Sequence, residues 1–402
     1  MSSPFGGINY ASASSEAQFH PCRERKFRKM KSSIVHKACR GLLQLTCVLW
    51  MVGCAVAPPP APKAQDIPVF PPAPEEARFF YERTLYSSAD VLKENKNATM
   101  RQLLTGESAS SAEGLGKPYG VAVFHGRVYV SDTAQRSVVV FDIPGQRFFR
   151  IGEDEGTGKL VMPIGLDVDG KGNVYVADNS AKLVKVYDPD GKFLRTLGGG
   201  GTWFERPSGI AVDAQGSKVY VVDTGGVNSD LHRVRVFNAQ SGEHLFDFGK
   251  RGTGPGELNL PRDVTIGLDG LLYVVDGGNF RVQVFQPDGT FLNTFGSVGR
   301  QGGQFSRPKE AAVDPQGNVY IVDSAFGNFQ LFNTAGQLLL SVGSRSERDG
   351  MAKYMLPSGI AIDGDGRVYI VDQFFRKVDV YRPARLAPED GFVFKKAAAI
   401  PK

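Results

Sequence analysis

The sequence predicts an all-β fold, a six-bladed β-propeller with four antiparallel strands per blade, from three recurring features. The first is a proline that opens an apolar stretch, as in PYGVAV. The second is a run such as VYVSD that ends in aspartate, and the third is a run such as VVVFD shortly after it. The opening prolines are Pro118, Pro163, Pro207, Pro261, Pro308 and Pro357, so successive units begin 45, 44, 54, 47 and 49 residues apart. A period near 45 residues with several short strands is typical of a propeller blade.

The fourth repeat shows how each unit divides into strands. Apolar residues alternate with polar ones in residues 263–268, 271–276, 281–286 and 290–296, which indicates four strands. The DG and PDG sequences between them suit tight hairpin turns, because glycine and aspartate accept positive φ. One blade cannot bury both of its faces alone, so the blades are expected to stack around an axis.

The closure of the ring is predicted from the two ends of the repeat region. The sixth repeat has no good fourth strand after VDVYR. Upstream, residues 101–106 (RQLLTG) end twelve residues before Pro118, the same offset that separates Gly296 from Pro308. We therefore expect residues 101–106 to form the outer strand of the sixth blade and to leave no open edge in the ring.

The segment before the repeats has the layout of a secretory signal. Basic residues precede an apolar stretch from Gly41 to Val52, which is short for a transmembrane helix. The stretch ends in MVGC, which resembles the lipobox of bacterial lipoproteins, and by that resemblance Cys54 carries a lipid. The alternative is an uncleaved anchor helix from about Leu42 to Ala57. Both interpretations place the repeats outside the cytoplasm.

These features divide the chain into five expected parts. They are a non-native or disordered extension (1–29), a lipoprotein signal segment (30–54), a Pro/Ala-rich tether (55–75), the propeller (76–385) and a C-terminal tail (386–402). Either Met1 or Met30 is then the start of the chain. Because Ala55 follows the cysteine, the pattern resembles that of lipoproteins sent to the outer membrane, and we expect an outer-membrane lipoprotein that faces the periplasm.

Charge and cysteine usage narrow the classes of function. The net charge is +5, but residues 101–385 contain 31 Lys and Arg against 32 Asp and Glu, and the basic excess lies near the N-terminus. Global charge is therefore poor evidence for nucleic-acid binding. The cysteines are Cys22, Cys39, Cys47 and Cys54. All of them precede the repeats, so the propeller can hold no disulfide and no thiolate metal site.

The fourth repeat resembles the NHL repeat, whose units run P-x-G-V-A-V-D, V-Y-V-x-D, N-x-R-V-Q-V-F and F-x-x-x-F-G. The matching residues in that repeat are Asp276, Asn279, Arg281, Val282, Val284 and Phe285. The resemblance covers about residues 101–382. Together with the lipobox, the chain resembles the six-bladed propeller lipoproteins of Gram-negative bacteria, most of which have no assigned reaction, so the fold does not supply a function.

Catalytic and metal-binding candidates are weak in this sequence. The six aspartates that end the second strands could form a ring of ligands, but their presence in every repeat favours acceptance of backbone N–H bonds. DVDGKGN and DGDGR lack the terminal glutamate of a calcium loop. Some NHL-like peptidylglycine lyases hold a metal with histidines, whereas His125, His232 and His244 fall in turns on opposite faces. We expect no metal, no cofactor and no enzymatic activity; the alternative is a hydrolase or lyase centred on the channel, as in lactonase-like propellers.

The sharpest candidate site lies where the repeats disagree. Four repeats carry glycine near the start of the first strand, namely Gly120, Gly165, Gly209 and Gly359. The fourth repeat instead has Arg262 with Asp263, and the fifth has Lys309 with Glu310, with Arg307 close in sequence. These side chains are predicted to lie beside the channel mouth and to form a polar patch for the charged group of a ligand. The alternative is that they pair with one another as surface salt bridges.

Loops on one face of the predicted disc carry further basic and aromatic residues, among them Trp203, Arg206 and Phe374. Such a mixture suits recognition of a protein loop or an acidic glycan, although scattered basic residues are also ordinary solvated surface. NHL domains of animal regulators bind RNA on this face, but an exported lipoprotein would rarely meet RNA. The sequence therefore favours a monomeric, lipid-anchored binding or scaffold protein of the cell envelope, with a protein or polyanionic glycan partner and no nucleic acid.

Overall fold

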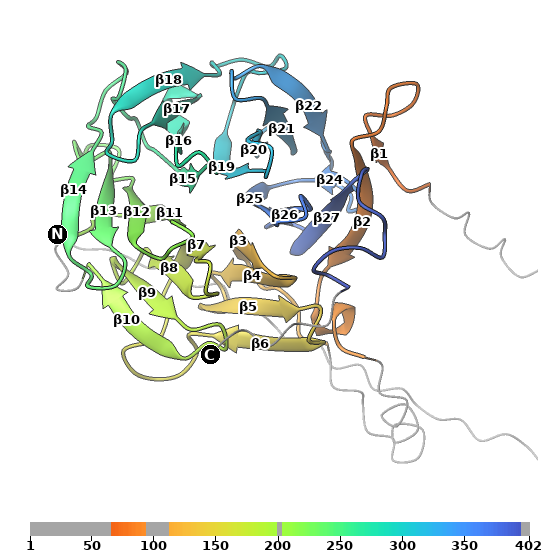
Figure 1. The fold of residues 1–402 in the computed structure, drawn as a ribbon, viewed down its shortest axis with the longest axis horizontal. Coiled ribbons are helices and arrows are strands. Elements are labelled where there is room, and N and C mark those ends of the chain that lie inside the picture. The colour runs from red at the N-terminus through yellow and green to blue at the C-terminus, as the bar shows by residue number, and fades with distance from the viewer. Residues whose placement is uncertain (1–65, 94–111, 199–202, 395–402) are drawn as a thin grey trace, which may run out of the picture. The chain divides into compact units, whose positions relative to one another are not determined.

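The computed structural model of the protein describes residues 66–93, 112–198 and 203–394. In the unit that begins at Asp66, six sheets are arranged around a common axis (Figure 1). This confirms the prediction of an all-β, six-bladed propeller with four antiparallel strands per blade. The helical elements among the described residues are two single 3-10 turns, η1 (Ser88–Asp90) and η2 (Gly277–Asn279).

Each of the first five blades is built from four consecutive strands, with the first strand nearest the axis and the fourth outermost (Figure 1). Their bounds are β3 (Pro118–Phe124), β4 (Arg127–Asp132), β5 (Ser137–Asp142) and β6 (Arg147–Ile151) in blade 1; β7 (Pro163–Val168), β8 (Val174–Asp178), β9 (Leu183–Tyr187) and β10 (Phe193–Leu197) in blade 2; β11 (Pro207–Val212), β12 (Lys218–Asp223), β13 (Arg233–Asn238) and β14 (His244–Phe248) in blade 3; β15 (Asp263–Ile266), β16 (Leu272–Asp276), β17 (Arg281–Phe285) and β18 (Phe291–Phe295) in blade 4; and β19 (Pro308–Val313), β20 (Val319–Asp323), β21 (Asn328–Phe332) and β22 (Leu338–Val342) in blade 5.

The sixth blade joins the two ends of the repeat region. Its strands, from the axis outward, are β25 (Pro357–Ile362), β26 (Val368–Asp372), β27 (Lys377–Pro383), β2 (Phe79–Leu85) and β1 (Val69–Phe70). A short parallel pair, β23 (Ser344–Arg345) and β24 (Lys353–Tyr354), lies in the loop before it.

The ring is closed by an N-terminal strand, as expected, but by different residues. Strand β2 pairs with β27 from Phe79 opposite Pro383 to Leu85 opposite Val378. Residues 101–106, which we expected in this position, lie outside the described residues. The expectation was wrong because it relied on a fixed offset to Pro118, whereas the FFYERTL segment buries Phe79, Tyr81 and Leu85 and fills the outer position itself.

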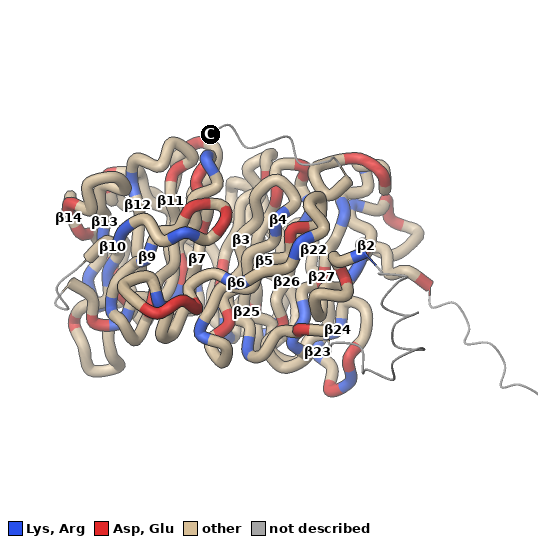
Figure 2. The backbone as a smooth tube through the Cα atoms, turned by 90° about the horizontal axis from the view of Figure 1, so that it is seen from below, with Lys and Arg blue, Asp and Glu red and all other residues tan. Residues whose placement is uncertain are grey.

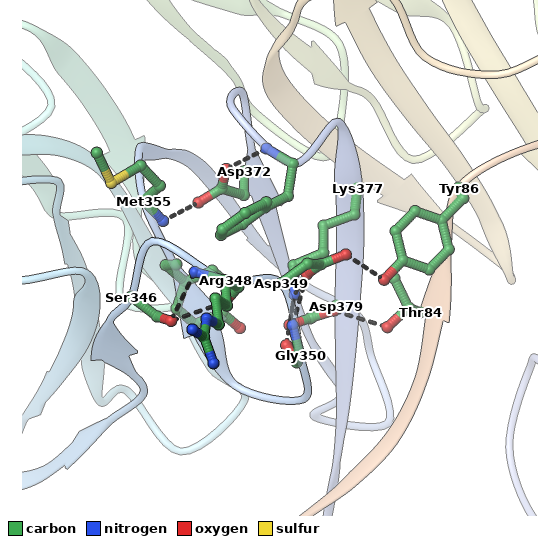
Figure 3. A network of polar contacts seen from close by, with 12 residues as sticks. Thr84, Tyr86, Ser346, Arg348, Asp349, Gly350, Met355, Asp372, Lys377 and Asp379 are labelled. Atoms are coloured by element: carbon green, nitrogen blue, oxygen red, sulfur yellow. Dashed lines mark hydrogen bonds and ion pairs between the residues drawn. The ribbon is translucent and has the colours of Figure 1, made fainter.

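A buried polar network fastens this closing strand (Figure 3). The ammonium group of Lys377 is fully buried and lies 2.9 Å from Asp349 Oδ1 and 3.1 Å from Asp379 Oδ2. From the N-terminal side, Thr84 Oγ1 donates to Asp379 Oδ1 at 2.8 Å and Tyr86 donates to Asp349 Oδ2 at 2.8 Å. Residues almost 300 positions apart are thereby held together by charge-assisted hydrogen bonds.

The core consists of apolar layers between neighbouring blades. The second strands are almost wholly buried, as in β8 and β20, because each blade is covered on both faces by its neighbours. This explains why VYVAD and VYIVD read as continuous apolar runs with only the terminal aspartate polar.

Two faces of the disc are distinguished below. The proline face consists of the loops that precede the six opening prolines and the turns between second and third strands; it lies at the bottom of Figure 2, beside β23 and β24. The hairpin face carries the other turns. Lys and Arg are interspersed with Asp and Glu around the ring in Figure 2, so a basic site has to be sought locally.

The packed region extends beyond residues 76–385 at both ends. Strand β1 falls within the segment 55–75 that we expected to be a tether, and Phe70 packs against Tyr381 with ring centres 5.9 Å apart. In the expected tail, Phe392 stacks on His125 at 4.6 Å. Cys54 and the expected signal segment lie outside the described residues, among which no helix is long and apolar enough to cross a membrane.

Candidate ligand site at the channel mouth

The innermost strands meet in two different ways around the axis. A Cβ atom on Gly165 would lie 2.2 Å from the carbonyl oxygen of Ser208 in the next blade, and one on Gly359 would lie 2.7 Å from that of Tyr119. Such contacts are too short for any side chain, so glycine is required where the backbones approach. We call these contacts the glycine joints; they involve Gly120, Gly165, Gly209 and Gly359.

Between blades 4 and 5 and between blades 5 and 6, a carboxyl group replaces the glycine. Asp263 Oδ2 accepts a hydrogen bond from the backbone N–H of Ala311 at 3.0 Å, and Glu310 Oε2 accepts one from Ile360 at 3.3 Å. We call these two contacts the acid joints. In each, the carboxyl group of one blade accepts a backbone N–H from the next blade. Asp167 makes a similar bond with Val212 N–H beside the glycine joint at Gly165.

Burial in the channel controls the ionisation of these groups. Asp263 and Glu310 are 7% and 9% exposed. Burial raises the pKa of Asp263 to about 7, against the N–H bonds from Ala311 and Val264, and the nearby Asp167 carboxyl raises it further. The pKa of Glu310 is raised well above its usual range by burial and then by Asp263. Two close carboxyls in a poorly solvated site resist carrying two charges.

Four cations and one tyrosine lie above the acid joints on the proline face. Lys309 Nζ lies 5.9 Å from the ring centre of Tyr119. The pKa of Lys309 is lowered to about 8 by burial and then by the charges of Arg262 and Arg307. The pKa of Tyr119 is raised to about 12 by burial and Glu310, and is opposed by Arg262 and Arg206. Arg262 and Lys309 occupy the same repeat position at the starts of neighbouring innermost strands, and Arg206 and Arg307 precede the opening prolines of blades 3 and 5. We call this group at the axial end of the proline face the cationic mouth: Tyr119, Arg206, Arg262, Arg307 and Lys309.

The repeat itself positions the mouth residues. Arg206 and Arg307 each directly precede an opening proline, and their backbone N–H groups donate to the strand-end aspartates Asp223 and Asp323 at 2.8 and 2.9 Å. The hypothesis that these aspartates accept backbone N–H bonds is confirmed. They bond the loop before the proline, a partner that the sequence did not indicate, as well as the following turn, as in Ala325 N–H to Asp323 at 2.9 Å.

The cations of the mouth have no ion-pair partner among the described carboxylates within 4.0 Å, unlike Arg127, Arg281 and Arg367 elsewhere in the ring. The alternative that Arg262, Asp263, Lys309 and Glu310 form salt bridges with one another is therefore not what this structure contains. Asp263 and Glu310 face the neighbouring backbone instead, and the positive charges remain free to meet a ligand.

Two predicted site residues lie apart from the mouth. The Trp203 ring lies 6.0 Å from that of Phe237 and 5.1 Å from the guanidinium of Arg235, in the outer part of blade 3. Phe374 is 58% exposed in the turn of blade 6 and packs edge-on against Phe375.

Sequence reasoning missed two residues of the region. Tyr119 occupies the position between proline and glycine that is filled by Arg262 and Lys309 in other repeats, so aligning that position would have found it. Asp167 lies two residues after Gly165, accepts Val212 N–H at 2.8 Å, and has a pKa that burial raises to about 7.

A cavity of about 500 Å³ lies in the channel, and all six innermost strands line it. Its acidic lining is Asp167, Asp169, Asp213, Asp263 and Glu310; it also includes Leu268 in a turn of the hairpin face. The histidines contact separate surroundings: His125 stacks on Phe124, His232 accepts from Leu260 N–H, and His244 bonds Asp247. Among the described residues, no group of three or more His, Cys, Asp or Glu could hold a metal ion.

Comparisons with known proteins agree with this architecture. Residues 258–285 match the NHL repeat family. A segment of 114 residues, 26% of this chain, is 34% identical to NHL repeat-containing protein 3 of Homo sapiens and spans 31% of that protein. A segment of 130 residues is 29% identical to NHL repeat-containing protein 2 of Homo sapiens, covering 28% of this chain and 17% of that protein.

The segments that match NHL repeat-containing proteins 3 and 2 each span less than a third of the length of those proteins. A solved structure of a protein of unknown function from Bacteroides thetaiotaomicron VPI-5482 is 20% identical, with a TM-score of 0.53 and 75% of each chain covered. The chain contains an NHL repeat in a six-bladed propeller, and the structural likeness concerns the fold alone.

Proposed function

We propose that this protein is a lipid-anchored binding protein of the cell envelope whose proline face docks an acidic partner, either a protein or a glycan. The observation that carries the proposal is the cationic mouth. Four cations from three adjacent blades face outward without a described carboxylate partner, while the acids beneath them are hydrogen-bonded to backbone. A complementary acidic surface would relieve the repulsion among these cations and be guided to the mouth by their field.

The exposed position of Phe374 provides the test. A photoreactive phenylalanine analogue at Phe374, on the same face, is used to crosslink partners in intact cells for mass spectrometry. The Arg262→Ala/Lys309→Ala double variant is expected to lower the yield of the crosslinked partner by about tenfold or more, since centrally placed charges contribute most to such contacts. Equal yields from the double variant and the parent would overturn the proposal.

A matched control removes the same charge from the opposite face. Lys171 and Lys192 are exposed in turns of the hairpin face. The Lys171→Ala/Lys192→Ala double variant is expected to keep the yield within about twofold, because distant surface charges act weakly at physiological salt. A loss equal to that of the mouth variant would show a general charge effect and would count against docking at the mouth.

The lipid anchor is part of the same proposal and rests on the sequence MVGC. Radioactive fatty acid should label the parent protein and not the Cys54→Ala variant. Equal labelling of the parent and the variant would contradict lipidation at Cys54. The docking face would then still be tested by the crosslinking experiment.

A channel-centred hydrolase or lyase is the second candidate. It is favoured by one observation: the pKa of Asp263, raised to about 7 by burial, suits a general acid or base near neutral pH. A panel of lactones and esters, with and without added divalent cations, tests it. Turnover of a substrate by the parent but not by Asp263→Asn would support the enzyme and count against the binding function. No turnover of any compound in the panel would favour the binding function.

A further inference from the structure

We infer that the cationic mouth is a subsite for one compact phosphate monoester group carried by the partner. This inference rests on the proposed docking function and specifies its ligand chemistry. Its geometric basis is the placement of Arg206, Arg262 and Lys309 at the proline-face ends of the innermost strands of blades 3, 4 and 5, with Lys309 Nζ 5.9 Å from the Tyr119 ring centre.

The balance of charge favours a dianion. Four cations, Arg206, Arg262, Arg307 and Lys309, surround the mouth, and two carboxyl groups, Asp263 and Glu310, lie behind it. Even with both carboxyls ionised, two positive charges remain in excess. A phosphate monoester carries close to two negative charges at neutral pH, whereas a carboxylate carries one. The monoester therefore offsets more of the excess positive charge than a carboxylate does.

The kind of donors points the same way. Three of the four cations are arginines, whose planar guanidinium groups bind phosphate and carboxylate oxygens in pairs. The donors approach from different blades, so they suit the several oxygens of a tetrahedral group better than the two coplanar oxygens of a carboxylate.

The limited extent of the positive charge indicates a single compact group. Around the axis, the residues that precede the opening prolines are basic at Lys117, Arg206 and Arg307 but apolar at Met162, Leu260 and Leu356. The residues that follow the opening prolines are basic at Arg262 and Lys309 and uncharged at Ile164, Ser208 and Ser358. Blades 2 and 6 carry no basic residue at either position and blades 3 to 5 carry most of the charge, which favours one compact anionic group over a polyanion that follows the whole ring.

Binding of phenyl phosphate to the purified full-length protein, measured by calorimetry near pH 7.5 in phosphate-free buffer, tests the inference. Benzoate serves as the monoanionic probe with the same ring. We expect saturable binding of phenyl phosphate and about tenfold or more weaker binding of benzoate. Two variants, Arg262→Ala and Lys309→Met, are made separately in case one fails to fold. Each should weaken the binding of phenyl phosphate by about tenfold.

Matched control variants on the same face are Arg300→Ala and Arg348→Ala, both exposed and outside the mouth. They should leave the dissociation constant within about twofold. The inference is overturned by a lack of saturable binding up to about 10 mM, by equal binding of benzoate, or by equal losses in the control and mouth variants.

The two proposals fail in different ways. If the double variant loses its crosslinked partner while phenyl phosphate does not bind, docking stands and the phosphate subsite is wrong. If phenyl phosphate binds at the mouth while crosslinking is unchanged in the double variant, the subsite stands and the partner docks elsewhere.

Discussion

The glycine joints and the acid joints of the inner ring solve the same packing problem in opposite ways. At Gly165 the neighbouring backbone is so close that no side chain fits, while at Asp263 and Glu310 a carboxyl group spans the joint and is itself hydrogen-bonded. The glycine joints are sterically fixed, and at the joint between blades 2 and 3 the Asp167 carboxyl also accepts Val212 N–H beside Gly165. The acid joints place ionisable groups at the channel axis, and the mouth cations are grouped beside them, so the departure from symmetry coincides with the candidate site.

Adding a single methyl group at a glycine joint should give the largest effect. Gly165→Ala would push a Cβ to 2.2 Å from Ser208 O, so the ring has to open locally. We expect a loss of about 3 kcal/mol or more in the free energy of unfolding, measured by urea denaturation. Gly226→Ala, where the Cβ would lie 3.4 Å from a side-chain oxygen of Glu205, should change it by less than about 1 kcal/mol. Similar losses in both variants would show that the joint is not specially tight.

The acid joints should contribute a pH dependence of their own, in addition to that of Asp167 at the joint between blades 2 and 3. The folded pKa of Asp263 is about 7 against 3.8 for the free side chain, and that of Glu310 is also raised. A raised pKa means that the folded state binds the proton more tightly. The contribution of these two groups to the free energy of unfolding is therefore fully present below about pH 4 and is lost as the pH rises through 7.

The Asp263→Asn/Glu310→Gln double variant should therefore gain stability relative to the parent by roughly 2 to 3 kcal/mol between about pH 5 and 8. The charged neighbours of the pair are Asp167 and Lys309, which are unchanged in the comparison. Urea denaturation at several pH values measures the difference, and parallel pH profiles for parent and variant would contradict the assignment.

Removing the acceptor at an acid joint should have an intermediate effect. Glu310→Ala leaves the Ile360 N–H without its side-chain partner and should be less stable than Glu310→Gln by about 1 to 2 kcal/mol, whereas Glu310→Gln keeps an acceptor, avoids the cost of ionisation and should be at least as stable as the parent near pH 7. Thermal unfolding of the two variants gives the comparison. An equal loss in Gln and Ala would mean that the charge, rather than the hydrogen bond, holds the joint.

The smallest expected effect concerns ligand affinity. Lys309 has a pKa of about 8 and faces Arg262, Arg307, Glu310 and Tyr119. A bound anion would favour its charged form, so phenyl phosphate should bind about tenfold more weakly at pH 9 than at pH 7. Lys309→Met should bind weakly at both pH values and lose this dependence, while Arg262→Ala should keep it. If phenyl phosphate binding by Lys309→Met weakened as much between pH 7 and pH 9 as binding by the parent, a group other than Lys309 would be responsible for the titration.

Much of the fold was predictable from the sequence. In the fourth repeat, the expected strands 263–268, 271–276, 281–286 and 290–296 correspond to β15, β16, β17 and β18 within a few residues. The closing strand was not predictable from the sequence. Its pairing with β27 is a contact between residues almost 300 positions apart, and nothing in FFYERTL identifies the strand with which it pairs.

The candidate site was predictable in part. Replacement of glycine by Asp263 and Glu310 directed attention to the channel, and Arg206, Arg262, Arg307 and Lys309 lie at the proline-face ends of three neighbouring innermost strands. Trp203 and Phe374 were grouped with them only because their loops share a face, and the angular positions of loops around a ring cannot be read from local sequence.

The sequence alone therefore determined the repeat, the number of blades and the positions where symmetry is broken, since period, turn residues and apolar alternation are local properties. The tertiary structure decided which strand closes the ring, that the acids bond neighbouring backbone rather than the adjacent cations, and that Tyr119 joins the mouth. Those outcomes depend on distances and burial between blades far apart in the chain, and the ionisation of Asp263 and Lys309 follows from that burial.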